Sequence, residues 1–326
     1  MIHYYLKCRK EGITMDSFLY SINATLPIFL MIILGKVLYQ LHIIDTHFTK
    51  IADKYVFMAA LPALVFKDLT ENDIKGSFDG GYVLFCFLTT LSIILLIWGL
   101  TELFMKNESQ KGAFIQASYR SSAAILGLAF IDNMYHSAGM APLMIIGAVP
   151  LYNIFAVLIL TLKGDNDSSH DIGKTILDIF KNPILLSILI SMLFVFSGLR
   201  LPAFLNKTIN SIGATATPLA LISIGAGFEG RKAIKKIKPT IIASFIKLVL
   251  LAALFLPLAI YLGYRNQELM AILIMLGSPA TVSCYIMAKN TGNDHVLTSS
   301  IIVLTTLLSS VTLTVWIFLL HAASLL

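Results

Sequence analysis

Ten long apolar segments run along this chain and restrict what it can fold into. A helix that crosses a membrane needs about 20 mostly apolar residues, and segments of that kind recur over almost the whole sequence. They lie near residues 17–41, 47–66, 81–105, 111–132, 139–162, 183–199, 206–228, 239–263, 268–289 and 295–320. We therefore predict an all-α membrane protein with ten transmembrane helices.

The composition supports a membrane protein. Hydrophobic residues make up 57% of the 326 residues and charged residues only 13%, and the mean hydropathy is +0.83. A water-soluble fold cannot bury so much apolar surface. The first apolar segment is long enough to span the bilayer and has no cleavable-signal pattern, so we expect a multi-pass protein of the cell membrane.

Patterns typical of enzymes and metal sites are missing from the sequence. Cys8, Cys86 and Cys284 lie far apart without CxxC spacing, which predicts neither a disulfide framework nor a metal site. There is no HExxH, no GxSxG and no phosphate loop. We expect no enzymatic activity, no cofactor and no nucleic-acid partner; a membrane sensor or enzyme is an alternative that these absences oppose.

A basic loop between the seventh and eighth segments sets the expected orientation. It contains Arg231, Lys232, Lys235, Lys236 and Lys238. Basic loops stay in the cytoplasm, so both termini should face outward, although the same cluster could also bind lipid. Lys7, Arg9 and Lys10 at the amino end oppose this orientation, and translation from Met15 would remove the conflict.

Similar segments recur at nearly one spacing. Ser121–Ala124 resembles Ser278–Thr281 and Asn133 matches Asn290 at an offset of 157, while Ala60–Leu64 resembles Ala216–Ala220 at 156. Five helices in each half would make the second half inverted relative to the first, as in many secondary transporters. The predicted parts are an N-terminal extension 1–16, a first five-helix repeat 17–162, a cytoplasmic linker 163–182 and a second five-helix repeat 183–326.

Helix-breaking residues lie inside the fourth and ninth segments. Pro279 cannot donate a backbone hydrogen bond and Gly277 lets the chain unwind, while Ser121 and Ser122, followed by Gly127, weaken the fourth segment. Broken helices line cavities, because their freed backbone groups need partners. If the two helices cross, their half-helix amino termini attract anions; a plain kink at Pro279 is the alternative.

Two basic residues, Arg120 and Lys247, lie near the middle of apolar segments. A charge at that depth normally faces the protein interior and serves function, although Arg120 could instead bind backbone carbonyls. Lys247 could reach the interface with its flexible stem or become neutral on burial. We predict an anion-binding site composed of Arg120, Ser121, Ser122, Lys247, Ser278, Pro279 and Thr281.

The carboxylates are expected away from this depth. Those considered lie near helix ends or in loops: Asp16, Asp53, Glu102, Asp132, Glu229, Glu268 and Asp294. An anionic substrate therefore fits better than a cation. Proton coupling through Asp53 or His42 stays open.

Several motifs between Phe18 and Leu320 occur in an order that resembles a known family. They are Leu26–Phe29, Leu34–Gly35, Ala59–Phe66, Tyr119–Ser122, Leu126–Leu128, Thr217–Leu221, Ile224–Gly225, Lys247–Leu248 and Ser278–Ala280. On these residues the chain is similar to the auxin efflux carrier family, which includes bacterial malonate and related dicarboxylate permeases and plant PIN-type carriers.

The resemblance implies an inverted-repeat carrier with broken, crossing helices four and nine. Helices one, two, six and seven would form a scaffold, and the other helices a transport domain that moves like an elevator, often in a homodimer. The carboxylate substrate would bind at the crossing. The family usually has Asn where this chain has Ser122 and commonly Pro where it has Ala129, so the substrate should not be copied from relatives.

Two transporter functions follow from these features. The first is a permease or efflux carrier of small organic anions, with membrane lipid and a second copy of the chain as its other expected partners. The alternative is a sodium-coupled organic-anion symporter of the bile-acid type, which needs polar side chains to hold sodium. Near Pro218 only Thr215 and Thr217 offer hydroxyl groups.

Overall fold

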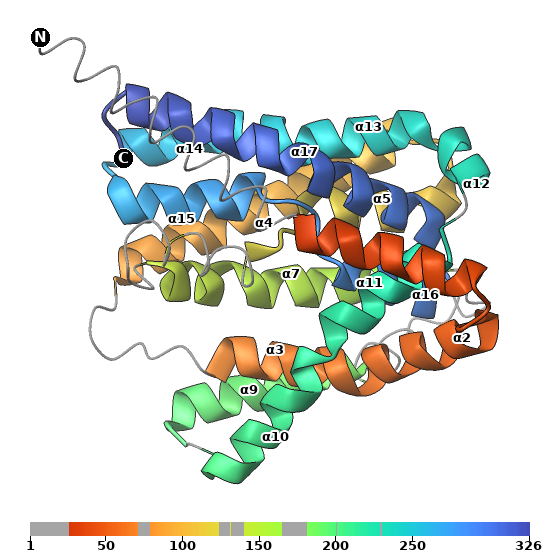
Figure 1. The fold of residues 1–326 in the computed structure, drawn as a ribbon. Helices are drawn as coiled ribbons and strands as arrows, with labels where there is room; N and C mark the ends of the chain where they lie inside the picture. The colour runs from red at the N-terminus through yellow and green to blue at the C-terminus, as the bar shows by residue number, and fades with distance from the viewer. Residues whose placement is uncertain are drawn as a thin grey trace, which may run out of the picture.

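The computed structural model describes residues 26–70, 79–123, 131, 140–164, 181–199, 201–228 and 230–326. Within them the regular structure is helical (Figure 1). The predicted N-terminal extension 1–16, most of the linker 163–182 and the predicted features at Gly127, Ala129 and Asn133 lie outside the described residues.

The described helices follow the apolar segments closely. In the first half they are an unlabelled helix Leu26–Gln40, α2 (Thr46–Tyr55), the π-helical turn η1 (Val56–Ala60), α3 (Leu61–Thr70), α4 (Gly80–Phe104), α5 (Glu108–Tyr119) and α7 (Ala141–Lys163). In the second half they are α9 (Pro183–Ser197), α10 (Ala203–Ala214), α11 (Ala216–Ala226), α12 (Gly230–Lys235), α13 (Ile237–Phe245), the π-helical turn η2 (Ile246–Leu250), α14 (Leu251–Tyr261), α15 (Asn266–Gly277), α16 (Ser283–Asn290) and α17 (His295–Ala322).

Five of the described helical stretches are long and apolar enough to cross a membrane. They are Gly80–Phe104, Ala141–Lys163, Ala203–Ala226, Ile237–Tyr261 and His295–Ala322. Shorter apolar helices occur at Leu26–Gln40, Pro183–Val195 and Asn266–Gly277. The predicted all-α membrane class is confirmed, and the count of ten spans stays a prediction.

Polar residues at the loop edges fix where several helices begin. Asp79 accepts a hydrogen bond from the backbone N–H of Tyr82 at 3.0 Å, and Asp294 accepts one from Leu297 at 2.9 Å. Each carboxylate satisfies a donor that the first helical turn would otherwise leave unpaired. The apolar helices therefore begin at specific residues and do not slide along the apolar run.

Two long helices contain a wider π-helical turn. In the first, α2, η1 and α3 form one continuous helix in which Leu61 donates to the carbonyl of Val56. Pro62 follows directly, and its missing N–H disturbs the regular α-helical ladder there. In the second, Leu251 donates to the carbonyl of Ile246, and the turn holds Lys247.

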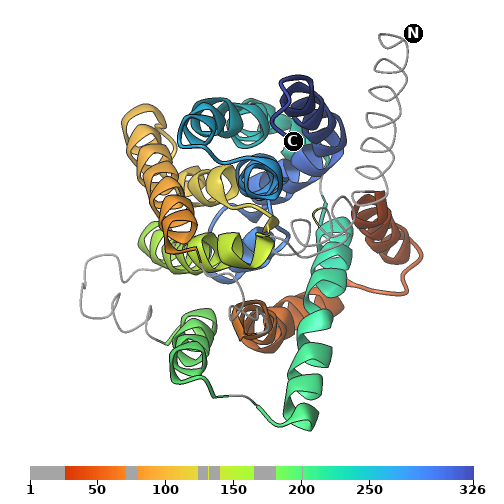
Figure 2. The ribbon, with the colours of Figure 1, turned by 90° about the vertical axis from the view of Figure 1, so that its left-hand side faces the viewer.

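The helices pack in two groups (Figure 2). The first helix group consists of Leu26–Gln40, α2, η1, α3, α9, α10 and α11, in which α3 packs against α9 and α10, and α2 against α11. The second helix group consists of α4, α5, α7, α13, η2 and α14–α17, in which α4 packs against α7 and α13 against α17. The two groups meet mainly where α7 contacts α9 and where α16 contacts η1 and α11.

Two glycines let helix Leu26–Gln40 lie directly on α11. A Cβ on Gly35 would clash with the backbone carbonyl of Ile222, and a Cβ on Gly225 would clash with that of Ile32. Close backbone contact at small residues is a common way to pack helices in a membrane. Two of the motifs noted in the sequence, Leu34–Gly35 and Ile224–Gly225, therefore form one contact.

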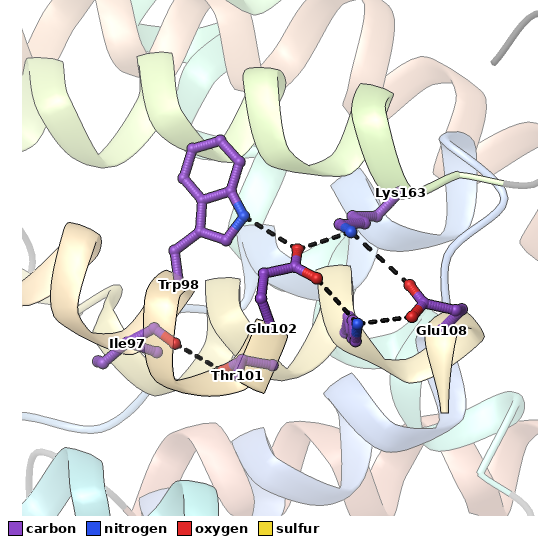
Figure 3. A network of polar contacts seen from close by, with 7 residues as sticks. Ile97, Trp98, Thr101, Glu102, Glu108 and Lys163 are labelled. Atoms are coloured by element: carbon purple, nitrogen blue, oxygen red, sulfur yellow. Dashed lines mark hydrogen bonds and ion pairs between the residues drawn. The ribbon is translucent and has the colours of Figure 1, made fainter. Parts of the chain in front are cut away.

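An ionic network ties the ends of α4, α5 and α7 together (Figure 3). Lys163 lies 2.6 Å from one carboxylate oxygen of Glu102, and Lys111 lies 2.8 Å from the other. Glu108 contacts the same two lysines at 2.5 and 3.7 Å, and the indole of Trp98 donates to Glu102 at 3.2 Å. Glu102 is therefore the shared partner of three side chains.

We expect Glu102→Gln to lower the melting temperature of the detergent-purified protein by a few degrees. The network is partly exposed, so its loss costs about 1 kcal/mol, near the upper end for surface ion pairs. Glu108→Gln is the matched control and should change the melting temperature less, because Glu108 is the more exposed carboxylate. Equal melting temperatures for Glu102→Gln and the unmodified protein would contradict the structural role of the network.

Candidate binding site at two broken helices

Helices α5 and α15 both stop inside the protein, and their ends meet. Arg120, after α5, and Ser278, after α15, have extended backbone angles. Ser121 pairs with Ala280 in an isolated antiparallel bridge, and the N–H of Ser122 donates to the carbonyl of Pro279 at 3.0 Å. The two extended segments thus supply hydrogen bonds that neither helix can supply at its break.

The carbonyls at the end of α15 accept hydrogen bonds from side chains of other segments. The carbonyl of Met275 accepts hydrogen bonds from the Ser121 hydroxyl at 2.5 Å and from the Tyr152 hydroxyl at 3.1 Å. The ammonium of Lys247 donates to the carbonyl of Leu276 at 2.7 Å. A cation at a helix carboxyl end is favourable, because free carbonyls carry partial negative charge there.

Arg120 is buried beside neutral partners. It is 5% exposed; its guanidinium donates to the Asn153 amide oxygen at 2.5 Å and to the Met287 sulfur at 2.7 Å. Asn153 is held in place by its own hydrogen bond to the carbonyl of Val149 at 2.9 Å. No Asp or Glu in the described part of the chain forms an ion pair with Arg120, so its charge is not neutralised there.

A cavity of about 50 Å³ opens beside Arg120. Four of the seven predicted site residues line it, namely Arg120, Ser121, Ser122 and Thr281. Further polar lining comes from Asp68, Tyr152, Asn153 and Ser283, and apolar lining from Leu61, Leu64, Val65, Val149 and Ile184. A single water needs about 10–15 Å³, so this cavity admits a small polar ligand or a few waters.

The other three predicted residues, Lys247, Ser278 and Pro279, lie at the break and do not line the cavity. Lys247 is fully buried and caps α15, and the carbonyl of Pro279 is taken by Ser122. The Ser278 hydroxyl is buried without a hydrogen-bond partner in the described part of the chain. The structure therefore brings these residues to the crossing, and their contact with a ligand stays a prediction.

Sequence reasoning missed Asp68, Tyr152, Asn153 and Ser283. Asn153 could have been predicted from the sequence, because it is an amide in the middle of an apolar segment. Such a residue normally serves function or contacts another polar group. Asp68 lies near the end of α3 and still lines the cavity with Arg120. The expectation that no carboxylate reaches this site is therefore wrong.

The described residues contain no cluster of three or more His, Cys, Asp or Glu side chains that could hold a metal ion. The cavity instead combines hydroxyl, amide, carboxylate and guanidinium groups at a gap between helix ends. Such groups recognise a small polar solute by hydrogen bonds and charge. The arrangement thus suits binding of a small polar solute.

Comparison with known proteins places the chain in a family. Residues 20–317 match the family described as membrane transport protein. The chain belongs to this family, the auxin efflux carrier family. It is a multi-pass membrane transporter and not an enzyme.

Two archaeal relatives have nearly the same length as this transporter. An uncharacterized transporter of Methanocaldococcus jannaschii is 22% identical over 302 residues, which cover 90% of this chain and 97% of the relative. An uncharacterized transporter of Methanothermobacter thermautotrophicus is 22% identical over 305 residues, which cover 92% and 98%. The similarity therefore extends over most of the length of this transporter.

We expect Lys247→Met to lower the melting temperature of the purified transporter. The change leaves the buried carbonyl of Leu276 without its donor, which costs about 1–3 kcal/mol. Lys36→Met is a matched control, because Lys36 also donates to a carbonyl, that of Phe228 at 3.0 Å, but is only partly buried. Water can replace that donor, so the control should lose less. A higher melting temperature for Lys247→Met would mean that burial of the ammonium costs more than its hydrogen bond contributes.

Proposed function

We propose that this protein is a secondary transporter of small organic anions, with carboxylates as the substrate class. The observation that carries the proposal is Arg120, a buried cation with neutral partners beside a cavity where two broken helices meet. A buried charge is costly unless it is paired. A carboxylate in the cavity would provide the missing partner for part of the transport cycle.

The cavity chemistry supports a carboxylate over other anions. The planar guanidinium group matches the two oxygens of a carboxylate, and the hydroxyls of Ser122, Thr281 and Ser283 offer further donors on the cavity wall. The small volume favours a short substrate, such as a monocarboxylate or a short dicarboxylate. Ser122, which replaces the usual Asn of the family, leaves more room for the bound anion or a water.

The proposed architecture is ten spans in two inverted five-helix repeats, 17–162 and 183–326, joined by a linker. Its support comes from the two helix ends at the site. α5 ends at Tyr119 and α15 ends at Gly277, a separation of 158 residues that agrees with the sequence offsets of 156 and 157. Corresponding breaks in two halves are typical of inverted-repeat transporters.

We infer an elevator-type movement of the second helix group against the first. The cavity lies between them, because α3 and α9 of the first group supply part of its wall. The second group supplies the rest through α7, α16 and the two extended segments that follow α5 and precede α16. Displacement of one group would therefore open or close the cavity. Alternating access by movement of one helix bundle around a central site is common in such folds.

A sodium-coupled organic-anion symporter is the second candidate, and Asp68 is the observation that favours it. Coupled carriers use buried carboxylates to hold cations, and Asp68 lines the same cavity as Arg120. The threonines near Pro218 add little support, because the Thr215 hydroxyl contacts the carbonyl of Ile212 at 2.7 Å and Tyr55 at 3.1 Å. We therefore place uncoupled anion transport first.

The proposal predicts that Arg120→Gln weakens carboxylate binding by roughly 10- to 100-fold, since hydrogen bonds to a charged group contribute about 1.5–3 kcal/mol. A thermal-shift screen of the purified transporter with mono- and dicarboxylates identifies the ligand, and uptake into proteoliposomes measures transport. Lys207→Gln is the control: it removes one positive charge from α10 at a residue outside the cavity lining. Unchanged uptake by Arg120→Gln would remove Arg120 from the site.

Asn153→Asp tests the same idea without removing Arg120. A carboxylate in place of the amide would pair with the guanidinium that Asn153 now contacts at 2.5 Å, and it would repel an anionic substrate. We expect a folded protein, with an unchanged or higher melting temperature, that has lost carboxylate uptake. Normal uptake by this variant would show that the substrate does not depend on the charge of Arg120.

Coupling is tested by uptake with sodium replaced by choline in the external buffer. We expect equal rates in the two buffers, and Asp68→Asn should not change this. If uptake instead requires sodium, and Asp68→Asn removes the requirement, the symporter would replace the uncoupled carrier as the function of this cavity.

A further inference from the structure

A second and larger hollow lies on another part of the protein. It is a groove of about 730 Å³ between α4 and the continuous helix α13–η2–α14, and it shares no lining residue with the Arg120 cavity. Its walls are mostly aliphatic and aromatic, with Ile93, Ile97 and Leu100 on one side and Ile242, Leu250 and Phe255 on the other. Both walls belong to helices that are apolar enough to cross a membrane.

One end of this groove is polar and positively charged. Lys106, Asn107 and Gln110 border it on one side, and Lys238 borders it on the other. Lys106 and Lys238 are exposed and take part in no ion pair or hydrogen bond in the described part of the chain. Lys238 also belongs to the basic cluster that begins at Arg231, which adds positive charge near the same end.

The length of the groove matches one leaflet of a bilayer. From Ile93 to Phe104, α4 rises about 16 Å at about 1.5 Å per residue, and half of a hydrocarbon core is about 15 Å thick. Lys106 and Lys238 then lie where the headgroups of that leaflet begin. The groove has the polarity of a single lipid molecule, because it is apolar along its length and positively charged at one end.

We propose that the groove binds an anionic phospholipid from the leaflet on the basic side of the transporter. An acyl chain lies along the apolar walls, and the phosphate contacts Lys106 and Lys238, whose ammonium groups are suitable phosphate partners. A second copy of the chain is a poorer occupant. A two-fold axis along the membrane normal would bring the two lysine pairs of both copies together at the same level, where they would repel.

The test uses the full-length purified transporter and an equimolar mixture of phosphatidylglycerol and phosphatidylcholine, with retained lipid counted by native mass spectrometry. We expect the unmodified protein to retain phosphatidylglycerol preferentially. Lys106→Gln/Lys238→Gln should lower this preference roughly 30-fold, because each lysine near an anionic surface contributes about 1 kcal/mol and about 1.4 kcal/mol is a factor of ten. Lys50→Gln/Lys54→Gln removes the same charge from α2 and should leave the preference unchanged.

The apolar walls are tested by filling the groove. Leu96, which is 53% exposed, lines it, whereas Leu84, which is 56% exposed on the same helix, does not. Leu96→Trp should displace both lipids, and Leu84→Trp should retain them. Equal retention of the two lipids by the unmodified protein, or full retention of phosphatidylglycerol by Leu96→Trp, would overturn the proposal. A third outcome would also overturn it: the unmodified protein binds no lipid and is a dimer, while Leu96→Trp is a monomer. The groove would then be a subunit interface.

Discussion

The structure around the site depends on one constraint, which is that backbone groups freed at a helix break cannot stay unpaired in an apolar interior. The end of α15 frees the carbonyls of Met275 and Leu276. They accept hydrogen bonds from the Ser121 hydroxyl in the extended segment after α5, the Tyr152 hydroxyl on α7 and the Lys247 ammonium on η2. The bridge between Ser121 and Ala280 satisfies the extended segments themselves. Two of the residues that satisfy the break, Ser121 and Tyr152, also line the polar cavity.

Arg120 is the residue at this break on which the proposed binding site depends. Its partners, the Asn153 amide and the Met287 sulfur, fix the direction of the guanidinium without supplying a negative charge. Water in a small cavity compensates a buried charge only in part. In the proposed function, a solute that brings a carboxylate would gain the interaction that Arg120 lacks in the described part of the chain. Asp68 lines the same cavity from the first helix group.

The sequence predicted where the helices lie better than what their side chains contact. Apolar length located the helices, five of which are long enough to cross a membrane. The Gly277–Pro279 pattern located the end of α15. Both signals act along the chain. Whether a residue faces the cavity depends on how each helix is rotated, and packing against neighbours sets that rotation. Lys247 and Arg120 are both basic residues near the middle of apolar segments. Lys247 nevertheless caps α15, whereas Arg120 lines the cavity. Tyr152 and Asn153 were missed for the same reason.

The contact between the two helix groups limits how a transport movement could occur. Asp53 on α2 and Lys289 on α16 form an ion pair at 2.5 Å, in which the Asp53 side chain is only 4% exposed. Separation of these charges in the interior would leave an uncompensated carboxylate, which is far more costly than breaking a surface pair. A proposed elevator movement therefore needs water or another partner to reach Asp53 as α16 leaves. In the proposed elevator movement this pair would hold one state of the cycle, because the energy that it contributes would be lost as the two helix groups separate.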